Sequence, residues 1–176
     1  MKKKEESGNI RMIDVTEKES SLRKARAHAR VLLNSEVFKK ILTGKITKGD
    51  IFTAAKIAGI MAAKKNWWGY TALPPIEFDL CRFNFFSKEK PTSIESEVTV
   101  VGKTGAEMES LNAVVTAALT IYDMCKAFDK NIEIDQIFLI KKTGGKSGQF
   151  IRGKYYTWQE IKNNYNLSLC IQVQGG

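Results

Sequence analysis

Small apolar and charged residues alternate strictly between residues 24 and 31 of this chain. One side of the alternation carries Ala25, Ala27, Ala29 and Val31, and the other carries Lys24, Arg26, His28 and Arg30. A period of two is typical of a strand with one buried face, and it outweighs the helical propensity of the alanines. We therefore expect a strand with one basic face, on which His28 is solvated.

Three stretches instead place their apolar residues at helical spacing. A short helix is expected from Asn34 or Ser35, either of which can cap it, through Ile41, with Gly44 just past its end. A second helix is expected over residues 50–64, and the longest over residues 106–128. The third is long enough to pack across a whole sheet.

Further strand-like runs surround the longest helix. Residues 76–86 and 93–101 are joined by a polar turn and are expected to form a hairpin. Two more runs follow at 132–140 and 150–151, and the tail is expected to add a short helix near 157–164 and an apolar end. This order predicts an α+β domain of the ferredoxin-like kind, with an antiparallel sheet and helices packed on one face.

Composition narrows the class of protein. The chain has 176 residues, 43% of them hydrophobic, which suffices for one compact domain. Its 28 basic and 19 acidic residues give a formal charge of +9, which favours polyanionic partners without choosing among them. We find no signal peptide and no apolar run of about 18 residues, so we expect a cytoplasmic protein that contacts no membrane. The three cysteines are widely spaced, which indicates neither a disulfide framework nor a zinc site.

Several charged residues lie where they could bind an anion. Lys48 stands just before the second helix, where it and the free helix N–H groups could hold an anion together. Asp123 and Lys126 share one face of the longest helix beside its apolar stripe, where an ion pair can tune an acid or a base. An exposed ion pair with no function is the alternative for this spacing.

Other candidates have equally ordinary alternatives. Glu107 and Glu109 lie in the first turn of the longest helix, where the helix dipole alone favours carboxylates. The turn over residues 144–148 contains Lys146 and could wrap phosphate oxygens, although it lacks the first glycine of a Walker A loop. The aromatic residues at positions 67, 68 and 70 lie near Lys64 and could stack on a base or simply pack.

Taken together, several long motifs resemble the MoaC family of molybdenum-cofactor biosynthesis. They are MIDVTEK, LRKARA, TKGDIFTAAKIAGIMAAK, VGKTGAEMESL, AALTIYDMCKA and GGKSG, which together run from about Met12 to Phe150. We accordingly divide the chain into an N-terminal segment over residues 1–10, expected to be flexible, a MoaC-like domain over 11–151, and a C-terminal extension over 152–176.

The resemblance implies an enzyme of known chemistry. Members of the family are lyases that convert a cyclised GTP derivative, 3′,8-cyclo-7,8-dihydro-GTP, into cyclic pyranopterin monophosphate and release pyrophosphate. The resemblance also implies that the enzyme needs no cofactor or metal. It further implies a homohexamer assembled from dimers, with active sites between subunits. The family's catalytic residues correspond to Lys48, Asp123 and Lys126. Its substrate-binding residues correspond to Arg23, Lys64, Glu107, Met108, Glu109 and Lys146.

The chain departs from the family in one loop. The family carries Leu-Cys-His-Pro, with the cysteine and histidine in the active site, whereas this chain has Ala72-Leu73-Pro74-Pro75. A rebuilt loop, a silent subunit and a diverged paralogue that acts on another nucleotide are all compatible with this change. A nucleic-acid-binding module is the rival from another class, supported by the charge and by aromatics interleaved with basic residues. The Asp123–Lys126 pair disfavours it, since a strand-binding surface does not need this carboxylate.

Overall fold

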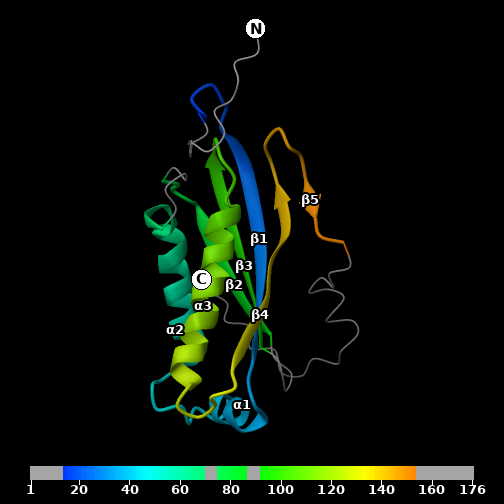
Figure 1. Cartoon of the computed structure of the whole chain (residues 1–176). Helices are drawn as coiled ribbons and strands as arrows, with labels where there is room; N and C mark the ends of the chain where they lie inside the picture. Colours follow the sequence, from blue (N-terminus) through cyan, green and yellow to red (C-terminus); the bar gives the residue numbers. More distant parts are fainter. Residues whose placement is uncertain (1–13, 70–74, 87–91, 154–176) are drawn as a thin grey trace, which may run out of the picture.

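The computed structural model of the chain describes residues 14–69, 75–86 and 92–153. Its framework is a five-stranded sheet in the order β2-β3-β1-β4-β5, in which every neighbouring pair is antiparallel (Figure 1). The strands are β1 (Ser21–Leu32), β2 (Leu80–Phe86), β3 (Thr92–Gly102), β4 (Glu133–Thr143) and β5 (Phe150–Ile151). The long strand β1 therefore lies at the centre, between β3 and β4.

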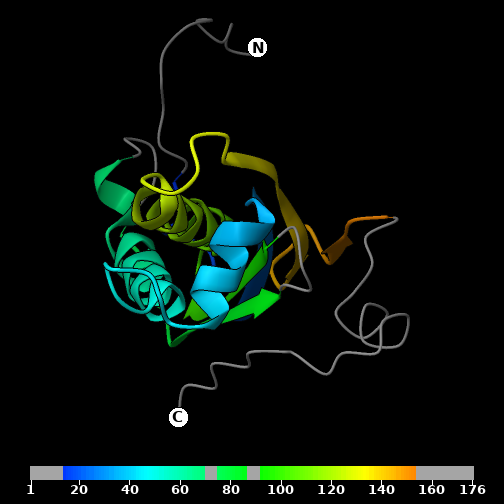
Figure 2. The same cartoon turned by 90° about the horizontal axis from the view of Figure 1, so that it is seen from below.

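The helices are α1 (Ser35–Leu42), α2 (Ile51–Lys64), the short 3-10 helix η1 (Asn66–Trp68) and α3 (Glu107–Cys125). The two longest, α2 and α3, form a second layer on one face of the sheet, and α1 lies across one end of it (Figure 1). Helices α2 and α3 lie side by side along the sheet (Figure 1, Figure 2). The N-terminus of α1 is capped as its sequence suggests, with Asn34 Oδ1 accepting from the N–H of Val37 at 2.8 Å. The predicted α+β fold with helices on one face is confirmed.

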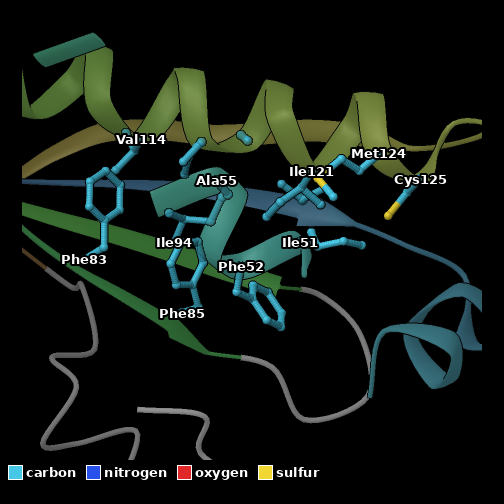
Figure 3. Close-up of a cluster of buried hydrophobic side chains, with 14 of the residues drawn as sticks. Ile51, Phe52, Ala55, Phe83, Phe85, Ile94, Val114, Ile121, Met124 and Cys125 are labelled. Carbon is cyan, nitrogen blue, oxygen red and sulfur yellow. The ribbon is translucent and has the colours of Figure 1, made fainter. Parts of the chain in front are cut away.

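Small residues allow the two layers to approach closely. Ala27 and Ala29 of β1 and Ala113 and Ala117 of α3 are completely buried between sheet and helix. A β-carbon added at Gly59 of α2 would lie 2.8 Å from the carbonyl oxygen of Ala113, so this position needs a glycine. Larger side chains from α2, β2 and α3 fill the remaining space and form the larger of two hydrophobic clusters in the described residues, seen in close-up in Figure 3.

Most predicted elements are present with shifted ends. Strand β2 begins at Leu80 rather than at residue 76, and α3 ends at Cys125 rather than at residue 128. After Cys125 the chain turns tightly, since the N–H groups of Phe128 and Asp129 both donate to the Cys125 carbonyl. The predicted hairpin is confirmed by the antiparallel pairing of β2 with β3. The expected N-terminal segment and the expected helix near 157–164 lie outside the described residues.

The prediction that His28 is solvated was wrong. His28 is only 3% exposed, and its ring stacks on Phe138 at a centroid distance of 5.0 Å. Its basic neighbours on β1 are paired, Arg26 with Glu95 and Arg30 with Asp135. Burial, followed by the charge of Arg30, lowers the pKa of His28 to about 4. The prediction of a strand from the alternation is confirmed. The face that carries His28, however, contains ion pairs and is not an open basic surface.

Within the described ranges, no helix is long and apolar enough to span a membrane.

Candidate active site

Lys48, Asp123 and Lys126 converge where α3 ends. Lys48 Nζ lies 2.8 Å from Asp123 Oδ2 and 2.9 Å from the Asp123 carbonyl oxygen. Lys126 Nζ lies 2.7 Å from the other carboxylate oxygen, Asp123 Oδ1. Each oxygen of one carboxylate therefore holds a different ammonium group. We call these three residues the lysine–aspartate cluster.

The part of the Lys48 prediction that involved the α2 N-terminus was wrong. Asp50 caps this helix, and its Oδ1 accepts from the N–H groups of Phe52 and Thr53 at 3.0 and 3.2 Å. These N–H groups are consequently occupied. Lys48 reaches instead across to α3, whose last turn supplies both of its partners.

The charges of the lysine–aspartate cluster are well defined at neutral pH. The hydrogen bond from Lys126, followed by that from Lys48, lowers the pKa of Asp123 to about 2. The same carboxylate raises the pKa of Lys126. Asp123 is thus ionised and Lys126 is protonated, so the cluster carries a net positive charge. All three side chains are about half exposed, which leaves the ammonium groups able to meet an anion or to donate a proton.

A second group of predicted residues lies around the first turn of α3. Glu107 pairs with Lys142 of β4, with 3.0 Å between Oε1 and Nζ. Glu109 is buried, and its Oε1 accepts from Asn66 Nδ2 at 2.9 Å. Burial, as the largest cause, raises the pKa of Glu109. Lys142 and Asn66 were not predicted from the sequence.

Arg23 and the glycine turn join this second group. Arg23 Nε donates to the carbonyl oxygen of Gly102 at 2.9 Å, which holds the guanidinium over the turn after β4. Gly145 adopts a φ of 77°, and a β-carbon there would lie 3.0 Å from Arg23 Cζ. The positive φ favours glycine at this position, and the missing side chain leaves room for the Arg23 guanidinium. The turn leaves the neighbouring Lys146 exposed.

Lys64 and Met108 belong to the same end of the molecule. Asn112 Nδ2 of α3 donates to the carbonyl oxygen of Ala62 at 3.1 Å, near the end of α2. The end of α2 therefore lies beside the beginning of α3, and this places Lys64, which is exposed, close to the first turn with Met108. We call this group the carboxylate end; its members are Arg23, Lys64, Asn66, Glu107, Met108, Glu109, Lys142 and Lys146.

The two groups lie at opposite ends of α3. With 19 residues at about 1.5 Å each, the helix separates its ends by about 28 Å. Figure 1 shows the turn after β4 and the end of α3 at opposite ends of the molecule. In a single chain, Lys146 therefore does not meet Lys48, Asp123 and Lys126. The predicted site residues of one chain therefore form two separate groups, each a candidate partial site.

The described residues were expected to hold no metal ion, and their possible metal ligands are scattered. Within residues 14–69, 75–86 and 92–153, no group of three or more His, Cys, Asp or Glu side chains is arranged to hold a metal ion.

Comparisons with known proteins give a consistent result. The family model described as "MoaC family" matches residues 12–145. A protein from Listeria monocytogenes serotype 4a named cyclic pyranopterin monophosphate synthase is 50% identical over 141 residues, which cover 80% of this chain and 88% of the relative. Proteins of the same name from Heliobacterium modesticaldum and Desulfitobacterium hafniense are 46% and 47% identical, and each match covers 84% of this chain and more than nine-tenths of the relative.

Proposed function

Because this chain belongs to the MoaC family, we propose that it is a cyclic pyranopterin monophosphate synthase of molybdenum-cofactor biosynthesis. In this role it converts 3′,8-cyclo-7,8-dihydro-GTP into cyclic pyranopterin monophosphate and releases pyrophosphate, with no cofactor. The relatives that carry this name match most of the chain at about half identity. A cytoplasmic location is part of the same proposal, because the substrate derives from a nucleotide.

The lysine–aspartate cluster carries the proposal. Two ammonium groups fixed on one ionised carboxylate can stabilise the negative charge that develops as pyrophosphate departs. The protonated Lys126 can in addition supply a proton to a leaving oxygen. Asp123 holds both lysines in place and keeps Lys126 protonated. The basic residues of the carboxylate end, Arg23, Lys64, Lys142 and Lys146, would hold the phosphates of the substrate.

The separation of the two partial sites supports an assembly of identical chains. A substrate cannot contact both ends of α3 in one chain, whereas the carboxylate end of one subunit can meet the lysine–aspartate cluster of another. Exposed apolar side chains on α2 and α3 suit such contacts, among them Ile57, Met61 and Leu119. We propose the hexamer built from dimers that the family resemblance implies, with active sites between subunits.

Mixing two inactive variants tests both the activity and the shared site. Lys126→Ala and Arg23→Ala are each expected to abolish pyrophosphate release from cyclised GTP, Lys126→Ala with nucleotide binding nearly intact. If their subunits are exchanged, some interfaces pair two intact partial sites, and turnover should return. Lys130→Ala removes an exposed lysine four residues after Lys126 and serves as the matched control.

The possible outcomes separate the two parts of the proposal. Wild-type protein that releases no pyrophosphate would contradict the synthase activity. Active wild-type protein whose mixed variants stay inactive after proven subunit exchange would contradict a site shared between subunits.

The departure at Leu73 and Pro74 lies outside the described residues and stays a prediction. The alternative that it supports is a diverged or silent paralogue. Leu73→Cys combined with Pro74→His is expected to raise the turnover rate or leave it unchanged. An inactive wild type beside an active double variant would identify a degenerate family member, whereas nucleotide binding without turnover in both proteins would indicate another substrate.

A further inference from the structure

Asn66 and Glu109 form a buried polar pair between η1 and the first turn of α3. Their exposed fractions are 2% and 3%, and Asn66 Nδ2 donates to Glu109 Oε1 at 2.9 Å. Two other atoms of the pair, the single side-chain oxygen Oδ1 of Asn66 and the second carboxyl oxygen Oε2 of Glu109, are buried without a hydrogen-bond partner in the described part of the chain. Buried polar atoms are almost always bonded, so two such oxygens on residues that already contact each other need an explanation.

A single proton satisfies both oxygens. We propose that Glu109 carries a proton on Oε2 and donates it to Asn66 Oδ1, so that acid and amide face each other through two hydrogen bonds and Asn66 holds Glu109 in its neutral form. A carboxylic acid and a primary amide each present one donor beside one acceptor, and they are therefore complementary. An ionised carboxylate has acceptors only and would leave both oxygens unsatisfied.

The charges around Glu109 agree with a neutral acid. Burial is the largest influence and raises its pKa, and the negative charge of Glu107 acts in the same direction. The Asn66 hydrogen bond and the backbone N–H of Glu109 itself act in the opposite direction, as does the positive end of the α3 dipole. Two basic residues of the carboxylate end are directed elsewhere, since Lys142 pairs with Glu107 and Lys64 is exposed.

The consequence for chemistry rests on the proposed function. The carboxylate end would hold a proton donor at neutral pH in Glu109, whereas the lysine–aspartate cluster holds an ionised carboxylate in Asp123. Two carboxyl groups with opposite protonation are a common basis for acid–base catalysis. Asn66 would act through Glu109 and is a positioning residue.

Infrared spectroscopy of the full chain tests the protonation without any substrate. A protonated carboxyl has a carbonyl stretch well separated from that of a carboxylate. We expect such a band at neutral pH in wild-type protein labelled with ¹³C-glutamate, and its loss in Glu109→Gln. Glutamine reproduces the donor and acceptor of the neutral acid, so this variant should stay folded. A spectrum of the wild type without a band that Glu109→Gln removes would overturn the proposal.

Substitution of Asn66 tests the partner. In Asn66→Ala the band should move to higher frequency, because the carbonyl loses its donor and the acid loses its acceptor. Asn66→Leu keeps nearly the shape of the side chain without any hydrogen-bonding group, and it provides the same test if the alanine variant does not fold. Asn112→Ala removes another α3 asparagine, whose hydrogen bond to Ala62 does not involve Glu109, and should leave the band in place. A band unmoved by the substitution of Asn66 would assign the proton to a different partner and refute the pair.

Measurements of turnover test whether the Asn66–Glu109 pair contributes to catalysis. Asn66→Ala should lower kcat roughly tenfold or more with KM little changed, whereas Asn112→Ala should leave both unchanged. Unchanged kcat in Asn66→Ala would remove the catalytic consequence. If the wild type shows the band but no turnover, the Asn66–Glu109 pair is supported and the proposed function is contradicted. If it shows turnover but no band, the proposed function is supported and the pair is contradicted.

Discussion

Acidification should destabilise this protein through His28. The pKa of His28 is lowered from 6.5 to about 4 in the folded chain, mainly by burial. Because the folded state resists protonation, the contribution of His28 is fully present above the unfolded pKa and is lost as the pH falls towards the folded pKa. Between about pH 7 and about pH 5 this linkage lowers the free energy of unfolding by about 2 kcal/mol, and the full loss at lower pH is about 3 kcal/mol.

Urea unfolding at the two pH values, at one protomer concentration, measures the contribution of His28 to the free energy of unfolding. His28→Gln cannot titrate, so the other groups that lose or gain protons affect both proteins equally and cancel in the comparison. We expect the wild type to lose about 2 kcal/mol more than His28→Gln between about pH 7 and about pH 5. Phe138→Ala removes the stacked ring and should bring the pKa of His28 back towards its ordinary value, which reduces the difference. Equal losses in wild type and His28→Gln would refute the burial of a neutral imidazole.

Three further predictions concern other features of the molecule. Asp50→Ala removes the cap of α2 and should lower the free energy of unfolding by about 1 kcal/mol in urea titrations, whereas Asp50→Asn should lower it less; equal losses would contradict a capping role. Gly59→Ala should cost about 1–3 kcal/mol in the same assay, because the new methyl group meets Phe83 and the Ala113 carbonyl; an unchanged midpoint would contradict this close approach. A labelled oligonucleotide should bind weakly, and a GTP analogue should bind with a shallow dependence on salt. Tight oligonucleotide binding that falls steeply with salt, without nucleotide binding, would favour the nucleic-acid module.

The sequence was most informative where structure depends on near neighbours. The alternation in β1 and the spacing in α3 identified both elements, since the periods of strands and helices are local properties. The Asp123–Lys126 ion pair was predicted for the same reason, because residues three apart on a helix share a face. The family resemblance was likewise carried by ungapped motifs and is confirmed by the match over residues 12–145. The predicted ends of β2 and α3 differ from the observed ones by three or four residues, because competing turn hydrogen bonds decide where an element stops.

Only the tertiary structure decided which distant residues meet. Lys48 and Asp123 lie 75 positions apart, and Asn66 and Glu109 lie 43 apart, so no local period relates them. His28 fits the strand pattern equally well exposed or buried. Phe138, which stacks on it, and the acidic partners of the arginines beside it come from other strands. The division of the predicted site between the two ends of α3 also required the structure. A motif records which side chains are present, but the length of the helix between them determines which can contact one substrate.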